Sequence, residues 1–233
     1  MARRFRRVLV AVVAVVLGGV AGAHFWVPSV VSAYKLPWAS GATHTVIQGN
    51  YQSQDRDACV SGCGMHNDDA MRFAWDFDLP EGTEVLAARS GTVALMNGSW
   101  RSDHCGGTNA AEAGTIISQF IGNQANFVEI AHGDGTSALY LHLSEVAPVI
   151  ERKAVTGEPV LQGELLGKSG RTGYTQCLPH LHFQIEQSVR ADWFTTSLPI
   201  AFADTDVVSR TANGVPEEGQ AYVSDNIPQY SAP

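Results

Sequence analysis

The chain has 233 residues, of which 45% are hydrophobic and 16% charged, a composition that excludes collagen-like and disordered classes and allows a packed core. Four arginines lie within the first seven residues, and the remainder has 11 basic and 23 acidic residues, a net charge of −12. Because binding to a phosphate backbone needs a basic surface, we expect no nucleic-acid partner.

The N-terminal segment has the layout of an export signal. The arginines precede an uncharged apolar run at residues 8–22, and small-x-small cleavage sites follow at 21–23 and 31–33. With a rise of ~1.5 Å per residue, the stretch 8–33 is also long enough to cross a hydrocarbon core of ~30 Å. We therefore expect an exported protein in which residues 1–33 are either a cleaved signal peptide or an uncleaved anchor that contacts the membrane.

Beyond this segment, short apolar runs alternate with breaks rich in Gly or Asp, and no long segment has helical periodicity. This pattern predicts an all-β domain at 34–225 and a flexible tail at 226–233. The pair Asp134-Gly135 predicts a hairpin turn, and the polar stretch 97–124 predicts a long loop that borders a binding site. The expected strands are 43–48, 73–77, 84–88, 91–96, 126–132, 137–143, 165–168 and 180–186.

An even number of cysteines agrees with export to an oxidising compartment, where thiols pair as disulfides. The four are Cys59, Cys63, Cys105 and Cys177. Of the three pairings, we expect Cys59–Cys63 as a local loop and Cys105–Cys177 as a long-range bridge. The alternative is a Cys/His zinc site, which an oxidising compartment disfavours.

A histidine pair marks the last expected strand. His180 and His182 are two residues apart, so they share one face, while Leu181, Phe183 and Ile185 point into the core. The alternative interpretation is a pair of surface or hydrogen-bonded histidines without a functional role.

Two further strands place polar side chains next to apolar ones. Asp76 lies between Trp75 and Phe77, and a carboxylate in such surroundings is costly unless it is paired or ligated; the alternative is a half-exposed strand with its acids in water. In another strand, alternation sets Tyr140 and His142 on the same side. Histidines with a carboxylate are the N and O donors that a catalytic zinc ion takes, with one position left open for water. The chain has no HExxH motif, which excludes the helical zincin arrangement.

With these motifs in their order, the chain resembles the lysostaphin/LytM-type zinc metallopeptidases, which hydrolyse peptide bonds of bacterial peptidoglycan. The resemblance covers about residues 66–186, which it implies is the core of the catalytic domain at 34–225. The matching segments are His66 followed by Trp75-Asp76-Phe77 and by 80–88, the hairpin 126–143, Gly163-Glu164-Leu165-Leu166-Gly167, and Gly170-Arg171-Thr172-Gly173 leading into Pro179-His180-Leu181-His182-Phe183.

The resemblance implies an antiparallel sheet or sandwich of the duplicated hybrid motif type, with long loops around a zinc groove. It also implies one Zn²⁺ per chain, with ligands His66, Asp76 and His182 and catalytic histidines His142 and His180. Peptidoglycan or another peptide is then the substrate. Two alternatives are an inactive scaffold or activator of another wall hydrolase, and a zinc endopeptidase that acts on non-wall peptides.

The sequence departs from the family pattern at the first ligand. The first His and the Asp commonly stand four apart in the family, whereas His66 and Asp76 stand ten apart, so Asp68 and Asp69 are candidate substitutes for His66. Asp78 is either an acceptor for a ligating imidazole or a surface acid. His132 flanks the hairpin turn, and we expect no catalytic part for it.

Overall fold

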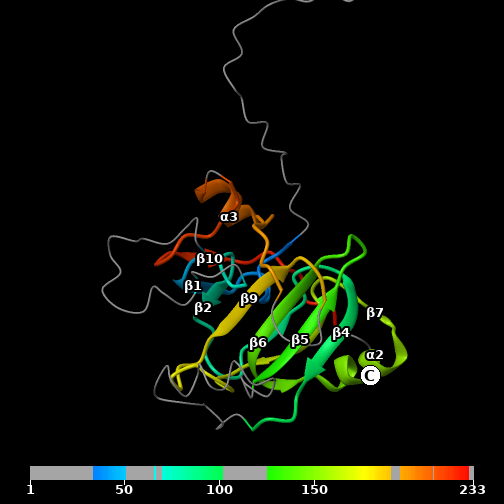
Figure 1. The fold of residues 1–233 in the computed structure, drawn as a ribbon. Helices are drawn as coiled ribbons and strands as arrows, with labels where there is room; N and C mark the ends of the chain where they lie inside the picture. Colours follow the sequence, from blue (N-terminus) through cyan, green and yellow to red (C-terminus); the bar gives the residue numbers. More distant parts are fainter. Residues whose placement is uncertain are drawn as a thin grey trace, which may run out of the picture.

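The structure is a computed structural model that describes residues 34–50, 66, 70–101, 125–189, 195–211 and 213–230. Within these residues the chain folds around a ten-stranded sheet, and every pair of named strands is antiparallel (Figure 1). The predicted all-β antiparallel class is therefore confirmed.

Eight of the ten strands follow the sequence prediction, mostly within two residues at each end, while β7 and β10 were not among the expected strands. β9, for example, begins one residue later than expected, and β6 runs three residues further. The strands are β1 (Thr43–Gln48), β2 (Trp75–Phe77), β3 (Glu84–Leu86), β4 (Gly91–Asn97), β5 (Asn126–Ala131), β6 (Ser137–Val146), β7 (Pro159–Val160), β8 (Leu165–Ser169), β9 (Leu181–Glu186) and β10 (Ala221–Val223).

Strand β9 lies near the middle of the sheet, between β2 and β6. The order along the sheet is β10-β1-β2-β9-β6-β5-β4-β7, and β8 pairs with both β3 and β6. Strands β5 and β6 form the expected hairpin, in which Gly135 adopts a φ of 88°, a value that glycine tolerates better than other residues. This order brings three strands that are distant in sequence side by side.

Aromatic side chains fill the core beneath β2 and β9. Trp75 and Phe77 from β2 and Phe183 from β9 are fully buried, and they gather around Phe202 with ring centroids 5.3 to 6.3 Å from it. Burying such large apolar surfaces supplies most of the favourable free energy of folding. Because Asp76 lies between two of these rings, the core fixes the direction of its carboxylate.

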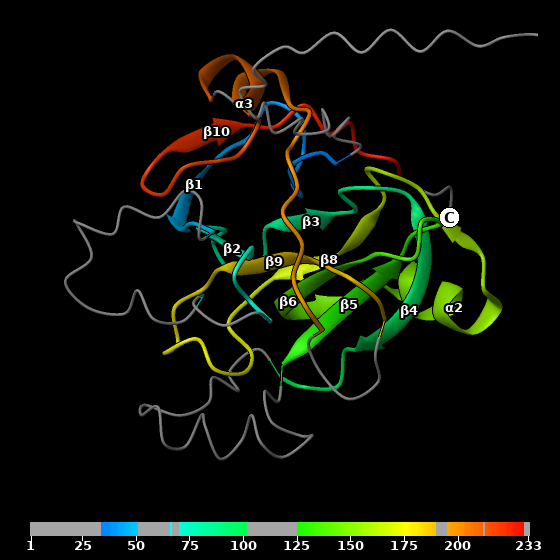
Figure 2. The ribbon, with the colours of Figure 1, turned by 45° about the horizontal axis from the view of Figure 1, so that its top comes forward.

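Two short helices, which the sequence analysis did not predict, complete the described part of the fold. Helix α2 (Pro148–Thr156) begins at a proline and ends at Gly157, whose φ is 73°. Helix α3 (Thr205–Arg210) lies beside β10, at the opposite end of the molecule from α2 (Figure 2). Neither helix, nor any other in the described ranges, is long and apolar enough to cross a membrane.

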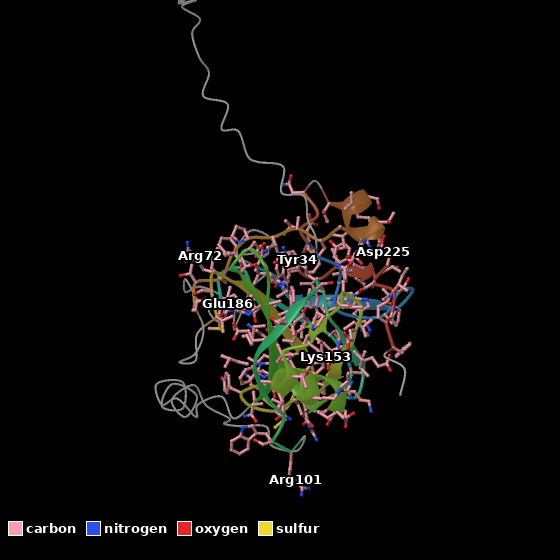
Figure 3. The ribbon with its side chains drawn as sticks, turned by 90° about the vertical axis from the view of Figure 1, so that its right-hand side faces the viewer. Tyr34, Arg72, Arg101, Lys153, Glu186 and Asp225 are labelled. Carbon is pink, nitrogen blue, oxygen red and sulfur yellow. The ribbon has the colours of Figure 1, made fainter. Side chains whose placement is uncertain are left out.

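The start and the end of the described chain are tied together. The carboxylate of Asp204 accepts hydrogen bonds from the backbone N–H of Leu36 and of Asp225, each at 2.8 Å. Burial, with the adjacent charge of Asp225, raises the pKa of Asp204 to about 6. Figure 3 shows Tyr34 and Asp225 toward one end of the molecule and Lys153 of α2 toward the other.

Several predicted features lie outside the described residues. They are the segment 1–33, three of the cysteines (Cys59, Cys63 and Cys105), most of the loop 97–124 and the last residues of the tail. Within the tail predicted at 226–233, Gln229 donates from its backbone N–H to the carbonyl of Gly163 at 2.8 Å. This part of the tail is therefore bonded to the domain.

Candidate metal centre

The pairing of β2 with β9 brings a carboxylate and an imidazole together. Asp76 stands directly opposite His182 in the antiparallel register, so both side chains leave the same face of the sheet. Asp76 Oδ1 lies 2.9 Å from Nδ1 of His182. The core face of the same pair of strands is apolar, which directs both polar groups away from the core.

His66 completes a three-residue cluster with this pair. Its Nε2 lies 3.7 Å from Oδ2 of Asp76, its ring centroid lies 5.2 Å from that of His182, and only 2% of its surface is exposed. Its Nδ1 hydrogen-bonds to the carbonyl of Gly49 at 3.4 Å. Although His66 stands ten residues before Asp76, the chain returns, so that His66 lies beside the aspartate. Asp68 and Asp69, the candidate substitutes, lie outside the described residues.

His142 reaches the same face through an irregularity in β6. Leu141 pairs with His182 and Tyr140 with Phe183, so regular alternation would turn His142 toward the core. Instead, His142 has a φ of 70° at a point where the register with β5 shifts. Its ring centroid lies 4.7 Å from that of His180. The prediction that Tyr140 and His142 share a side is therefore wrong, because a bulge re-aims the histidine.

Backbone carbonyls orient the two histidines beside the cluster. Nδ1 of His142 lies 2.8 Å from the carbonyl of Thr172, and Nδ1 of His180 lies 2.9 Å from the carbonyl of Leu178. Since a carbonyl only accepts, each Nδ1 carries the hydrogen, and each Nε2 is free to accept a proton when the ring is neutral. Nε2 of His180 lies 3.9 Å from Asp76 Oδ1.

Burial and neighbouring charges perturb the acid–base properties of the cluster. Burial lowers the pKa of His66, and burial together with the charges of His180 and His182 holds the pKa of His142 well below its usual range. Burial works in the opposite direction at Asp76, but the surrounding histidines outweigh it and keep the pKa of this carboxyl well below its ordinary value. Despite burial, the hydrogen bond and the charge of Asp76 raise the pKa of His182.

The donor set fits a metal ion. One ligand atom from each of His66, Asp76 and His182 lies within 4.8 Å of the others, and two nitrogens with one carboxylate oxygen suit zinc. An imidazole nitrogen and a carboxylate oxygen 2.9 Å apart are both acceptors unless a proton or a metal ion lies between them. This pair therefore holds a proton or a metal ion between its two atoms.

Sequence reasoning missed two polar residues that support these histidines. Gln184 contacts His182 with its side chain, and Thr172 accepts from His142 through its backbone while its Oγ1 donates to the carbonyl of Leu143 at 2.8 Å. The two-residue period that paired His180 with His182 also places Gln184 on their face, so the sequence could have predicted that Gln184 lies beside His182. Thr172 lies in the matching segment Gly170-Arg171-Thr172-Gly173, but nothing in that segment indicated its contact with His142.

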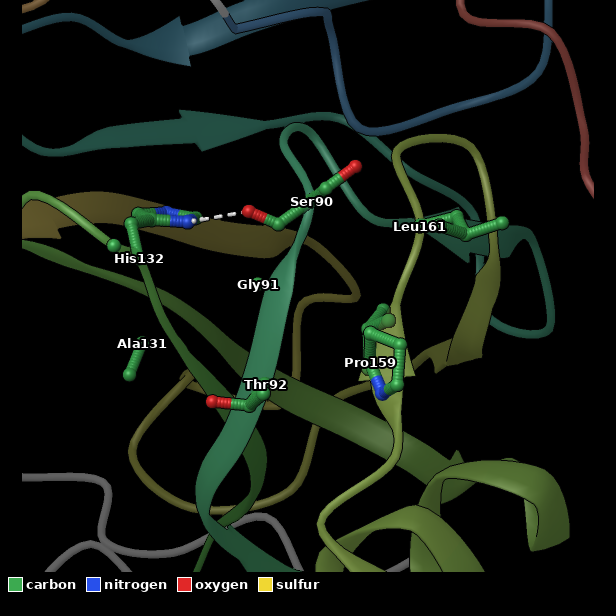
Figure 4. A pocket seen from close by; sticks show the side chains of 9 residues that line it. Ser90, Gly91, Thr92, Ala131, His132, Pro159 and Leu161 are labelled. Atoms are coloured by element: carbon green, nitrogen blue, oxygen red, sulfur yellow. Dashed lines mark hydrogen bonds between the residues drawn. The ribbon is translucent and has the colours of Figure 1, made fainter.

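The remaining polar candidates lie away from the cluster. Asp78 is exposed, and its backbone carbonyl contacts His44 at 2.9 Å, so it is a surface acid and orients no ligand. His132 lines a separate cavity of about 400 Å³ beside β4 and β7, where its Nδ1 donates to the carbonyl of Ser90 at 3.0 Å (Figure 4). Burial lowers the pKa of His132.

Only one cysteine falls within the described residues. Cys177 is disulfide-bonded, and since no other cysteine is described, its partner lies outside these residues. The pairing Cys105–Cys177 therefore stays a prediction, as does Cys59–Cys63.

Comparison with known proteins gives one family and several similar structures. The model of peptidase family M23 matches residues 70–192, more than half of the chain. A search of curated proteins gave no match.

Among solved structures, a zinc-containing peptidase from Vibrio cholerae is 20% identical over 66% of this chain, with a TM-score of 0.39; the match covers 36% of that protein, so this chain corresponds to about a third of it. The catalytic domain of lysostaphin from Staphylococcus simulans is 23% identical over 66% of this chain and 86% of that domain, with a TM-score of 0.38. A variant of the catalytic domain of the prophage-encoded M23 protein EnpA from Enterococcus faecalis is 16% identical over 70% of this chain and 94% of that domain, with a TM-score of 0.44. On the match of the family model, which spans both Asp76 and His182, the chain belongs to peptidase family M23.

Proposed function

We propose that the chain is an exported zinc metallopeptidase that hydrolyses peptide bonds in bacterial peptidoglycan. The observation that carries this proposal is the convergence of five side chains from four separate segments on one end of β9. Three of them, His66, Asp76 and His182, would hold the metal ion, and His142 and His180 stand beside them. Family membership supports the peptidase activity, and the sequence resemblance supports the wall substrate.

The chain's own residues divide the remaining work. When bound, zinc supplies a Lewis acid that polarises a carbonyl and acidifies water. His142 presents Nε2 as a proton acceptor because its Nδ1–H is held by the Thr172 carbonyl, 2.8 Å away. His180, oriented in the same way by Leu178, would stabilise the developing oxyanion or return a proton to the leaving amine. Asp76 stays ionised because the histidines around it lower its pKa.

The test compares the zinc content and the hydrolytic activity of the same purified protein. We expect about one zinc per chain, and we expect the protein to release new amino termini from isolated peptidoglycan but not from soluble peptides of matched length. Hydrolysis of the soluble peptides alone would support a peptidase of non-wall peptides. Folded protein that holds no zinc and leaves both substrates intact would overturn the proposal in favour of a scaffold.

A further inference from the structure

The side chain of Gln184 lies directly behind the imidazole of His182, on the polar face of β9. We propose that Gln184 is a positioning residue, whose amide holds His182 with Nδ1 toward Asp76 and joins the loop after His66 to the same strand. This inference rests on the proposed function, because it concerns how the zinc ligands are held. Its evidence is the set of hydrogen bonds that the amide makes.

The direction of the Gln184 amide is fixed by its donors. Its Nε2 donates to the carbonyl of Ala70 at 3.1 Å and to Oε1 of Glu186 at 2.7 Å. A carbonyl can only accept, so turning the amide over would set two acceptor oxygens against each other at Ala70. Both amide hydrogens are therefore used, and Oε1 of Gln184 faces His182.

This direction sets the tautomer of the imidazole. Oε1 of Gln184 lies 3.0 Å from Nε2 of His182, and since an amide oxygen only accepts, Nε2 carries the hydrogen. The lone pair of the neutral ring then belongs to Nδ1, which lies 2.9 Å from Asp76 Oδ1. A ligating histidine is held in just this manner when its other nitrogen donates to an oxygen.

The dependence on a side chain distinguishes His182 from the other histidines of the site. His66, His142 and His180 are oriented through Nδ1 by the carbonyls of Gly49, Thr172 and Leu178. No side-chain substitution removes a backbone carbonyl. His182 is therefore the histidine of this cluster that a substitution at Gln184 deprives of the hydrogen bond to its second nitrogen.

The same amide connects two parts of the chain to β9. Ala70 belongs to the segment between His66 and Asp76, so the bond to its carbonyl anchors the stretched ligand spacing to the strand that carries His182. Glu186 continues the connection, because its Oε2 accepts from the backbone N–H and the hydroxyl of Thr195, each at 3.2 Å. Figure 3 shows Glu186 on the same side of the molecule as Arg72.

The experiment measures the zinc dissociation constant of the full chain by competition with a chromophoric chelator. In Gln184→Leu, which keeps the bulk but removes the acceptor and both donors, we expect the constant to rise about 10- to 100-fold. The Co²⁺-substituted variant should also show a shifted visible absorption spectrum, since its ligand nitrogen is no longer held. Unchanged zinc affinity and an unchanged spectrum in the folded variant would overturn the inference.

A swapped pair separates orientation from packing. The double variant Gln184→Glu with Glu186→Gln keeps an acceptor for His182 and reverses the bond between the two side chains. It gives up the bond to Ala70 and sets a carboxylate oxygen beside that carbonyl, so we expect the zinc dissociation constant to rise by less than about tenfold. A loss as large as that of Gln184→Leu would overturn the inference. If Gln184→Leu does not fold, the comparison of the double variant with wild type decides alone, and a rise of more than about tenfold in its zinc dissociation constant overturns the inference.

A matched control and the wild type complete the design. Glu129→Gln removes a buried carboxylate from the same face of the sheet without touching His182, and we expect it to bind zinc as wild type does. If wild type itself binds no zinc, the proposed function fails. If wild type binds zinc and Gln184→Leu binds it equally well, only the role of Gln184 fails.

Discussion

The two faces of β9 are equally buried but are held by different forces. On the core face, Phe183 packs its ring 5.2 Å from that of Tyr140 and 5.8 Å from that of Phe202. On the polar face, His182, Gln184 and Glu186 form a continuous chain of hydrogen bonds. Because all six residues of the strand are buried, burial alone does not distinguish the core from the site.

The difference lies in how specific the partners are. Apolar packing is non-directional, so the core face is sensitive to lost volume. On the polar face each group depends on a partner of the right donor or acceptor type, and a buried group without one costs free energy. Substitutions on the polar face should therefore remove function while the fold survives. Substitutions on the core face should instead lower the free energy of unfolding.

The largest effect should come from the ligand on the polar face. His182→Ala should lose its zinc and all detectable hydrolysis, because the Lewis acid supplies several kcal/mol of transition-state stabilisation and each 1.36 kcal/mol is tenfold in rate. Zinc content and peptidoglycan hydrolysis measure this, and circular dichroism checks the fold. The matched control is His132→Ala. His132 is also a buried histidine, but it is bonded to the backbone carbonyl of Ser90, and its variant should keep both zinc and hydrolysis. Retained zinc in His182→Ala would remove His182 from the ligand set.

The next effect separates proton transfer from metal binding on the same face. His142→Asn and His180→Asn should each lower kcat/KM by about 100- to 10,000-fold while the zinc content stays near one per chain. Asparagine suits position 142 because it tolerates the left-handed conformation found there, with φ at 70°. Steady-state kinetics with zinc analysis measures both quantities. Wild-type kcat/KM in both variants would refute the assignment of these histidines.

The sequence predicted the faces of β9 because the two-residue period of a strand needs no knowledge of its neighbours. The same reasoning failed at His142, where one residue with positive φ reverses the side of the strand from which the side chain leaves. Helix α2 was missed because it is only nine residues long, and helix α3 has only six. Local periodicity does not register helices this short.

The support around the site was harder to predict than the site itself. The four candidate histidines and the aspartate carry chemistry that is recognisable from residue type and order. Thr172 and Ala70 act through backbone carbonyls, and any residue type supplies a carbonyl. Their roles follow from tertiary contacts alone, so even the matching segment that contains Thr172 did not indicate its contact with His142.

The core face should respond in the opposite way. Phe183→Ala should lower the free energy of unfolding by about 3–5 kcal/mol, because a fully buried ring is removed and the cavity refills only in part. Urea denaturation measures this, and Leu178→Ala, where the side chain is 62% exposed, is the control with little expected change. A loss below ~1 kcal/mol for Phe183→Ala would show that this face collapses to fill the cavity.

The smallest effect concerns how far the polar face extends. Glu129 on β5 pairs with Leu139, which pairs with Gln184, so the three share one face, and Ser137 donates to Glu129 Oε1 at 2.6 Å. Burial, with a contribution from the charge of Glu186, raises the pKa of Glu129 to about 7.

A carboxyl whose pKa is higher in the folded state makes the protein less stable as the pH rises from the unfolded pKa of about 4.5 to the folded value of about 7. Glu129→Gln cannot ionise but keeps an oxygen that accepts from Ser137. Its free energy of unfolding should therefore exceed that of wild type by about 1–3 kcal/mol at pH 8, and the difference should vanish near pH 4. Denaturation at both pH values measures this, with the exposed Glu158→Gln as a control that should show no such dependence. A difference that is equal at both pH values would mean that Glu129 contributes through packing, and that the ionisable polar face ends at β9.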